Sequence, residues 1–438
     1  MRPPNWKETV GSRLSIGRFA MALVMALSAS SLTVTQQLPP ANYDESKVGT
    51  YTLPDPLTFN DGSPVRTAND WTKRRRAEIL ELFATNIYGH SPSAPGKLNY
   101  EVFDTDTNAL GGKAIRKQVT IYFSPRKDGP KEDVLLYIPK ASRRPVPVFL
   151  LLSFTGNQAA ANDPAIKLGT VWNPRTREKQ QAPEETRGRA AADAAKVLDH
   201  GYAFATVCYT DIEPDFNGGY VSGIRPLFFK SGQTEPAPDE WGAIGAWSYG
   251  LSRVLDYFEK DKDVDAKRVA IVGHSRLGKT VLWAGAMDQR FAMVISSCSG
   301  EGGASLSRRD YGERIRNLAR VFPYWFATNY RKFADHEDQL PVDMHELIAL
   351  IAPRPVYVTG GETDRWADPK GEFLACVGAG PVYRLLNKQD LKTDQMPALD
   401  QPIMNTIAYH IHTGGHAITP FDWDQFLKFA DMHLRRPA

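Results

Sequence analysis

The stretch VAIVGHSRLGKTVLWAGA, residues 269–286, indicates the fold class, because it predicts an apolar strand that turns sharply into a helix. Two motifs fit that turn. Residues 273–280 match G-x-x-x-x-G-K-[ST], the loop whose backbone N–H groups and lysine hold the phosphates of a nucleotide. Gly273, His274 and Ser275 match the start of a nucleophile elbow, which exposes a reactive serine at the end of a strand. The rest of the chain has to discriminate between the two motifs.

Apolar runs of strand length alternate with helix-like segments on both sides of this stretch. Residues 133–139 and 146–154 are so uniformly apolar that we expect them inside a sheet covered on both faces. The clearest helix has an apolar stripe formed by Ile244, Trp247, Leu251, Val254, Leu255 and Phe258. This alternation predicts an α/β protein with a mostly parallel central sheet and helices on both faces.

The first thirty residues are typical of an export signal. A positive stretch ends at Arg18, an apolar run covers residues 19–27, and small residues follow. The run is too short to span a bilayer, which takes about 20 apolar residues. We therefore expect a signal peptide over residues 1–30, an extended arm over 31–44 and a single catalytic domain over 45–438. The exported protein would be periplasmic or secreted, without a membrane span, and a monomer.

The charge of the chain argues against a nucleic-acid partner. The formal net charge is +3, and residues 1–30 alone carry it, so the remainder holds 49 basic and 49 acidic side chains. A nucleic-acid-binding domain would have a basic excess. The three cysteines allow no disulfide framework, and we expect them buried as small apolar residues.

The phosphate-loop interpretation lacks partners. It needs an acidic residue at the end of an apolar strand to hold magnesium, and the nearest candidate, Asp211, precedes the loop. An exported protein would also rarely meet ATP.

The elbow interpretation finds its partners in the right order. Hydrolases of the α/β class carry serine, acid and histidine in that sequence, each on a loop after a strand. Glu362, Asp364 and Asp368 follow the apolar run PVYVTGG, and His416 follows a further strand and two glycines. The joint appearance of these groups favours a serine hydrolase, because each of them alone has a simple structural explanation.

Two other histidines raise the possibility of a metal. His410 and His412 alternate along a strand and so share one face, with His416 nearby. The chain has no HExxH helix or comparable ligand spacing. We therefore expect neither a metal nor a cofactor.

The elbow departs from the usual G-x-S-x-G pattern. Its second glycine is displaced by one position, which gives G-H-S-R-L-G-K, and Arg276 directly follows Ser275. The backbone N–H at that position normally helps to form the oxyanion hole. A guanidinium there could add a charged donor, which makes the stronger kind of hydrogen bond.

The chain resembles the glucuronoyl esterases, also called 4-O-methyl-glucuronoyl methylesterases, which form carbohydrate esterase family fifteen, in their bacterial form. Four passages carry the resemblance, at residues 241–280, 299–309, 350–373 and 412–434. It implies the three-layer sandwich of an α/β-hydrolase. It also implies cleavage of the ester between 4-O-methylglucuronic acid on xylan and lignin alcohols, in lignocellulose degradation.

The resemblance also implies roles for individual residues. Ser275 corresponds to the nucleophile, His416 to the base and Arg276 to the oxyanion side chain. Lys279 is similar to a contact with sugar hydroxyls, and Glu313 and Trp366 to further uronate contacts.

The acid of the triad departs from part of the family. Fungal members keep a glutamate just before the dipeptide Ser-Gly, where this chain has Cys298, and a thiol cannot replace a carboxylate in orienting a histidine. Many bacterial members resemble this chain in placing the acid in the loop ETDRWADP. We therefore assign the acid to Asp364, with Glu362 as the alternative.

Two other functions stay open at this point. One is a serine esterase of the same fold that acts on other carboxylic esters, such as acetylxylan or small esters. The other is a nucleotide-binding protein that uses the phosphate loop.

Overall fold

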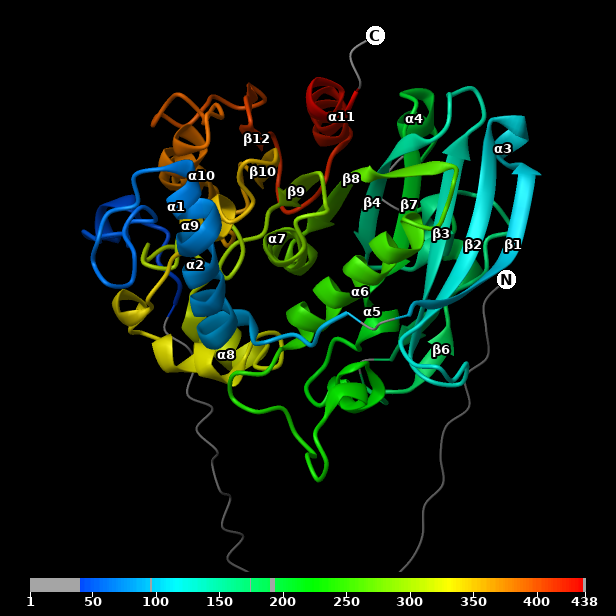
Figure 1. The fold of residues 1–438 in the computed structure, drawn as a ribbon, viewed down its shortest axis with the longest axis horizontal. Coiled ribbons are helices and arrows are strands. Elements are labelled where there is room, and N and C mark those ends of the chain that lie inside the picture. The colour runs from blue at the N-terminus through cyan, green and yellow to red at the C-terminus, as the bar shows by residue number, and fades with distance from the viewer. Residues whose placement is uncertain (1–39, 95–96, 174, 190–193, 436–438) are drawn as a thin grey trace, which may run out of the picture. The chain divides into compact units, whose positions relative to one another are not determined.

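A ten-stranded sheet runs through the centre of the molecule in the order β1-β2-β3-β7-β4-β8-β9-β10-β12-β11 (Figure 1). Neighbouring strands from β7 to β12 are parallel, whereas β1, β2, β3 and β11 pair antiparallel at the two sides. The predicted parallel core of the sheet is therefore confirmed. The strands are β1 Asn99–Asn108, β2 Ala114–Tyr122, β3 Lys131–Pro139, β4 Val146–Ser153, β7 Ala203–Cys208, β8 Val264–His274, β9 Met293–Ser297, β10 Val356–Gly361, β11 Ile403–Met404 and β12 Ile407–His412.

The computed structural model describes residues 40–94, 97–173, 175–189 and 194–435. Residues Pro40–Ala438 form one compact unit. The predicted signal peptide over 1–30 and the arm up to residue 39 lie outside the described residues.

Helices cover both faces of the sheet. They are α1 Ala68–Asp70, α2 Arg76–Phe83, α3 Ala109–Gly112, α4 Ala194–Asp199, α5 Tyr209–Ile212, α6 Ala243–Phe258, α7 Arg276–Met287, α8 Ile315–Val321, α9 Met344–Ala349, α10 Pro369–Leu385 and α11 Pro420–Leu434. Two π-helical turns, η2 Trp71–Arg75 and η3 Ala84–Tyr88, flank α2. A separate hairpin pairs β5 Thr170–Trp172 with β6 Lys179–Gln181. Short 3-10 turns are η1 Glu45–Lys47, η4 Asn157–Ala160, η5 Glu184–Thr186, η6 Gly219–Ser222, η7 Arg225–Phe228, η8 Thr328–Phe333 and η9 Glu337–Gln339.

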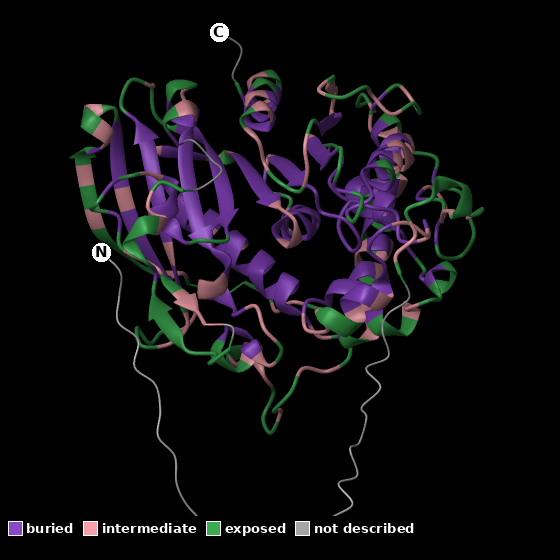
Figure 2. Ribbon diagram, turned by 180° about the vertical axis from the view of Figure 1, so that it is seen from behind, coloured by how far each residue is buried: buried purple, intermediate pink, exposed green. Residues whose placement is uncertain are grey.

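Strand β4 shows how the two layers are held. Val148 and Leu150 belong to a core cluster that includes side chains of α6, α7, α9 and α10. Phe149 and Leu151 point the other way, into a cluster with α4 and α11. All eight residues of β4 are buried, as the uniformly apolar sequence predicts (Figure 2). The sandwich therefore has one core on each face of the sheet.

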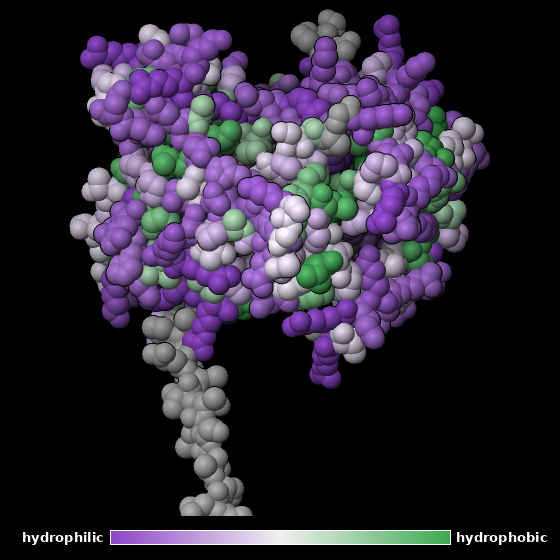
Figure 3. All heavy atoms as spheres, turned by 60° about the horizontal axis from the view of Figure 1, so that its bottom comes forward, coloured by the Kyte–Doolittle hydropathy of each residue, from purple (hydrophilic) through white to green (hydrophobic). Residues whose placement is uncertain are grey.

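One edge of the sheet and the outer surface of the molecule face solvent. Strand β1 lies at one edge and is largely exposed, and the face in Figure 3 is mostly hydrophilic, with hydrophobic side chains in small separate groups.

The three cysteines are free and buried, as predicted. Among the described residues, no helix combines the length and apolar character that crossing a membrane requires.

The topology concentrates functional loops at one edge of the sheet. The loops after β8, β9, β10 and β12 all leave the carboxyl ends of adjacent parallel strands. In open α/β sheets this edge is where ligands bind.

Candidate active site

Ser275 occupies a strained turn between β8 and α7. Its backbone angles are φ 58° and ψ −129°, and its N–H donates to Ser297 O at 2.8 Å. A side-chain-bearing residue rarely adopts a positive φ, and such strain is typical of functional sites. A Cβ at Gly273 would lie 2.1 Å from Leu277 O, so glycine is required there. The turn therefore has the geometry of a nucleophile elbow.

The displaced second glycine has a packing reason. A Cβ on Gly278 would lie 2.9 Å from Ser299 Cβ and 3.0 Å from Ser296 Oγ. The first turn of α7 thus presses against the end of β9 and the loop after it. The helix therefore approaches the strand most closely at residue 278, one position later than in the usual pattern. This close approach explains why the second glycine of G-H-S-R-L-G is displaced by one residue.

His416 and Asp364 form a hydrogen-bonded pair beside the elbow. Nδ1 of His416 donates to Asp364 Oδ2 at 2.6 Å, and the Asp364 side chain is 5% exposed against 44% for His416. The two loops are also joined by their backbones, since Thr363 N–H donates to Gly414 O at 2.9 Å. The structure therefore brings together the predicted base and the preferred acid.

The other two acidic residues of the loop lie elsewhere. Glu362 is exposed, and its backbone N–H donates to His412 O. Asp368 is buried, and its carboxylate accepts from Arg309 Nε at 2.9 Å. Of the three carboxylates, it is Asp364 that contacts His416.

Cys298 lies next to the same pair. Its thiol, the Asp364 carboxylate and a ring nitrogen of His416 all lie within 4.8 Å of one another. Burial, together with the nearby carboxylates of Glu372 and Asp364, raises the pKa of the Cys298 thiol well above its usual value. The thiol is therefore neutral and cannot stabilise an imidazolium as a carboxylate does.

One pocket of about 210 Å³ gathers six of the seven predicted site residues. The seventh, Asp364, contacts His416, which lines the pocket. The lining residues are Ser275, Arg276, Lys279, Cys298, Ser299, Gly300, Glu313, Phe322, Trp325, Trp366, Ala367 and His416. Sequence reasoning missed Phe322 and Trp325, although the aromatic run FPYWF was a signal that could have drawn attention to them.

Arg276 is held in place by an anion and three aromatic rings, those of Phe154, Phe322 and Trp325. Its guanidinium forms an ion pair with Asp215 and lies 4.7 Å from the Trp325 ring centre and 5.5 Å from that of Phe322. The same carboxylate accepts from Trp325 Nε1 at 2.7 Å and from the Tyr324 hydroxyl at 2.9 Å. These contacts preorganise the guanidinium beside the pocket. Asp215 lies in no recognisable motif, so its role could not be predicted from the sequence.

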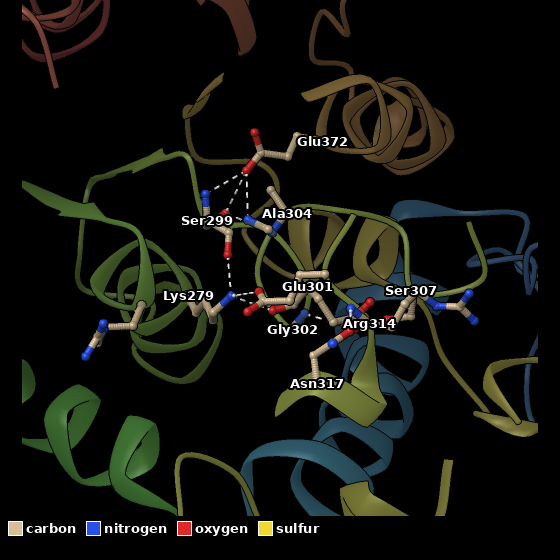
Figure 4. Close-up of polar contacts among 12 residues, drawn as sticks. Lys279, Ser299, Glu301, Gly302, Ala304, Ser307, Arg314, Asn317 and Glu372 are labelled. Atoms are coloured by element: carbon tan, nitrogen blue, oxygen red, sulfur yellow. Dashed lines mark hydrogen bonds and ion pairs between the residues drawn. The ribbon is translucent and has the colours of Figure 1, made fainter. Parts of the chain in front are cut away.

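Lys279 is almost completely enclosed. Its Nζ donates to Ser299 O at 2.6 Å and to Glu301 O at 2.7 Å (Figure 4). It also donates to Glu313 Oε2 at 2.9 Å. The three donors of the ammonium group are thereby occupied. A phosphate loop needs this lysine for the nucleotide, so the arrangement argues against that function. A direct contact with a sugar would require Lys279 to exchange one of these partners.

Glu372 holds the backbone of two residues that line the pocket. Its Oε1 accepts from the N–H groups of Ser299 and Gly300, at 2.7 and 3.0 Å. Burial, which outweighs these hydrogen bonds, raises the pKa of Glu372 to about 8. This residue fixes the segment that receives Lys279. It was not identified from the sequence, because nothing in the pattern distinguishes it from other helical glutamates.

His410 and His412, the two other histidines considered as metal ligands, both contact the carboxylate of Asp422. His410 Nε2 and His412 Nδ1 lie 2.5 and 3.0 Å from Asp422 Oδ1. The three side chains are buried and hydrogen-bonded to one another. The structure thus places His410 and His412 in a cluster behind the His416 loop, and sequence reasoning missed Asp422.

Comparisons with known proteins agree with this geometry. The family described as "Glucuronyl esterase, fungi" matches residues 236–387. The chain is 46% identical over 402 residues to "Carbohydrate esterase MZ0003" from an unknown prokaryotic organism, covering 90% of this chain and 92% of that protein. The solved structure of a glucuronoyl esterase from Solibacter usitatus is 52% identical, with a TM-score of 0.87, over 89% of this chain and 100% of that one. The chain belongs to the glucuronoyl esterase family.

As a glucuronoyl esterase, the protein is a carboxylic ester hydrolase, and the α/β-hydrolase sandwich predicted from the sequence is confirmed. A second solved relative, described as a promiscuous CE15 esterase from the marine bacterial metagenome, is 46% identical with a TM-score of 0.83, over 90% of this chain and 100% of that one. This chain is also 27% identical to 4-O-methyl-glucuronoyl methylesterase 1 of Phanerochaete chrysosporium, over 77% of this chain and 63% of that protein.

Proposed function

We propose that the protein cleaves the ester between (4-O-methyl-)glucuronic acid side chains of xylan and lignin alcohols by acyl transfer through Ser275, His416 and Asp364. The observation that carries the proposal is the 2.6 Å hydrogen bond between His416 and Asp364 beside an elbow serine, in a pocket lined by Ser275 and His416. Family membership supports the class of ester.

The reaction has two steps. Ser275 Oγ bonds to the uronate carbonyl carbon while His416 takes the hydroxyl proton, and the ester C–O bond then breaks as His416 returns this proton to the departing alcohol. In the second step His416 takes a proton from water, whose oxygen bonds to the acyl carbon. His416 then returns this proton to Ser275 Oγ as the acyl C–O bond to Ser275 breaks and the acid leaves. Asp364 holds the imidazole and stabilises its charged form.

Arg276 acts on the oxyanion. The guanidinium follows the nucleophile directly, and its contact with Asp215 keeps it at the pocket. A fixed charged donor stabilises the negative oxygen that develops in the tetrahedral intermediate, because it is already oriented when the charge appears.

The pocket suits a small acyl group. Its volume of about 210 Å³ is below the range of about 300–1,000 Å³ for drug-sized ligands. Trp366 is 41% exposed and can stack on a sugar ring, while Lys279 and Glu313 form the polar wall. We assign the uronate to this pocket and the alcohol to the open side.

A direct test is hydrolysis of benzyl glucuronate by the protein lacking residues 1–30, beside its Ser275→Ala variant and beside 4-nitrophenyl acetate. We expect serine-dependent cleavage with a strong preference for the uronate. The Ser275→Ala variant should lose about 10⁵–10⁶ in kcat, as in other serine hydrolases. If neither ester is cleaved, the proposed reaction is wrong.

A broader esterase is the second candidate. It is favoured by the relative described as a promiscuous CE15 esterase. Comparable kcat/KM values for the acetate and the uronate would select it.

We also propose that residues 1–30 direct export and are removed. The positive stretch followed by a short apolar run supports this, and the proposed polymer substrate lies outside cells. Mass spectrometry of the protein recovered from periplasm or medium would reveal the cleavage.

A further inference from the structure

A buried cluster of four side chains lies behind the loop that carries His416. Strand β12 directs His410 and His412 to the same face, where they meet Asp422 of α11 and Tyr357 of β10. The side chains of His410 and Asp422 are 0% exposed and that of His412 is 1% exposed. The proposed mechanism uses none of these groups.

The hydrogen-bond partners of His412 determine its charge. Its Nδ1 lies 3.0 Å from Asp422 Oδ1, and its Nε2 lies 3.0 Å from Gly415 O. A carboxylate and a carbonyl oxygen can only accept hydrogen bonds. Both ring nitrogens of His412 must therefore carry a proton, which makes the ring an imidazolium.

His410 needs no charge. Its Nε2 donates to Asp422 Oδ1 at 2.5 Å, and its Nδ1 can accept from the Tyr357 hydroxyl at 2.8 Å. The other carboxylate oxygen of Asp422 accepts from Thr419 N–H at 2.5 Å. The cluster thus holds one cation and one anion, so that each buried charge has a partner.

The surroundings favour this charge state. Burial opposes ionisation of Asp422, but the hydrogen bonds from His410, His412 and Thr419 outweigh it and hold its pKa well below the usual range. Burial likewise opposes protonation of His412, but Asp422, Gly415 O and Asp400 outweigh it and raise its pKa.

Three further titratable groups belong to the surroundings of His412. Asp400 accepts from the N–H and hydroxyl of Thr413, which follows His412 directly. Burial lowers the pKa of His274 to about 4, so this ring is neutral. His416 lies 4.5 Å from His274, measured between ring centres.

The contact with Gly415 leaves little freedom to the neighbouring His416. A Cβ on Gly361 would lie 2.3 Å from Gly415 O and 3.0 Å from His412 Nε2, so strand β10 closes the space around this carbonyl. Thr363 holds the preceding carbonyl, Gly414 O. Two consecutive carbonyls before His416 are therefore fixed by donors.

We infer that His412 is a permanent imidazolium and a positioning residue, which fixes Gly415 and through it the place of His416 relative to Ser275. The inference rests on the proposed function for the catalytic role of His416. The charge of His412 is a separate observable.

The charge is tested by nuclear magnetic resonance on the protein lacking residues 1–30, labelled with ¹⁵N-histidine and assigned with a His412→Gln variant. We expect both ring nitrogens of His412 to be protonated from pH 6 to pH 8. A neutral His412 ring in this range would overturn the inference. This readout does not depend on ester cleavage, so it is decisive even if the proposed reaction is wrong.

The positioning role is tested by comparing His412→Asn with His412→Gln. The Gln side chain can extend an N–H to the position of Nε2 and still reach Gly415 O, whereas Asn is too short. We expect Asn to lower kcat on benzyl glucuronate about 10- to 100-fold with little change in KM, because a small misplacement of a catalytic group is costly. Gln should restore a large part of this loss.

The pH dependence of kcat/KM distinguishes the effect of the charge of His412 from the effect of its shape. Both variants remove a positive charge near His416, which makes protonation of His416 easier, so the acidic limb of kcat/KM should move to higher pH. A merely structural role of a neutral His412 would leave this limb in place. His336→Gln, at an exposed histidine, is the matched control. A folded His412→Asn variant with wild-type kcat and an unmoved limb would refute the positioning role.

Discussion

Asp364 Oδ2 accepts a 2.6 Å hydrogen bond from His416 Nδ1, across 52 residues of sequence. The contact follows from strand register. Strands β10 and β12 are parallel neighbours with Gly361 opposite His412, so the loops that leave them start side by side. Asp364 lies three residues beyond one strand end, and His416 four residues beyond the other.

This pair predicts unequal effects of two carboxylate changes. Asp364→Asn should lower kcat about 10⁴-fold, because an amide favours the wrong tautomer of His416 and cannot stabilise its charge. Glu362→Gln, two residues away and exposed, should stay within about twofold of the wild type, a margin typical of surface changes. Steady-state kinetics on benzyl glucuronate measure both. The reverse order would transfer the role of the acid to Glu362.

The position of Arg276 predicts a loss in turnover. Arg276→Ala should lower kcat about 10²–10³-fold, the range for removal of one oxyanion donor. The matched control is Arg384→Ala, which breaks an ion pair with Asp390 at a side chain that is 60% exposed. Wild-type kcat in a folded Arg276→Ala variant would remove this residue from the mechanism.

The enclosure of Lys279 predicts an effect on stability. Lys279→Met leaves the Glu313 carboxylate buried without its cation, which should lower the free energy of unfolding by about 3–5 kcal/mol. Urea unfolding followed by circular dichroism measures it. Lys370→Met is the control, since its ion pair with Glu45 is about half exposed. Unchanged stability together with a raised KM would mean that Lys279 binds the sugar and does not stabilise the folded pocket.

His274 predicts a loss of stability in acid. Burial, with a smaller contribution from His416, lowers the pKa of His274 to about 4, against about 6.5 for an unfolded histidine. Between these values the unfolded chain binds a proton that the folded protein does not, so stability falls as the pH drops from about 6.5 to about 4. The loss from this group is about 2 to 3 kcal/mol at pH 4.5.

The measurement compares the free energy of unfolding at pH 7 and pH 4.5. In His274→Gln the decrease between the two pH values should be smaller than in the wild type by that amount, whatever its absolute stability. His336→Gln should show the wild-type decrease, because this residue is exposed. An equal decrease in all three proteins would mean that the folded protein protonates His274 by pH 4.5 as readily as the unfolded chain does.

The layers of the fold and the position of the elbow could be predicted from the amino-acid sequence. Periodicity is a local property, so the buried strand β4 and the stripe of α6 could be predicted from side-chain spacing alone. The order of serine, acid and histidine was equally visible. Sequence spacing could not show which carboxylate contacts His416, because the three acidic residues of one loop differ in the direction of their side chains, and this direction is set by the folded loop.

Tertiary structure also decided what surrounds these groups. Asp215 reaches Arg276 across 61 residues, and Asp422 of helix α11 reaches His412 of strand β12. Lys279 fits a sugar contact or a phosphate loop when it is read as a motif, but three buried acceptors occupy its ammonium group. Contacts of this kind arise when distant segments fold against each other at the carboxyl edge of the sheet. Neither spacing nor composition encodes them, since burial and hydrogen-bond geometry exist only once the chain has folded.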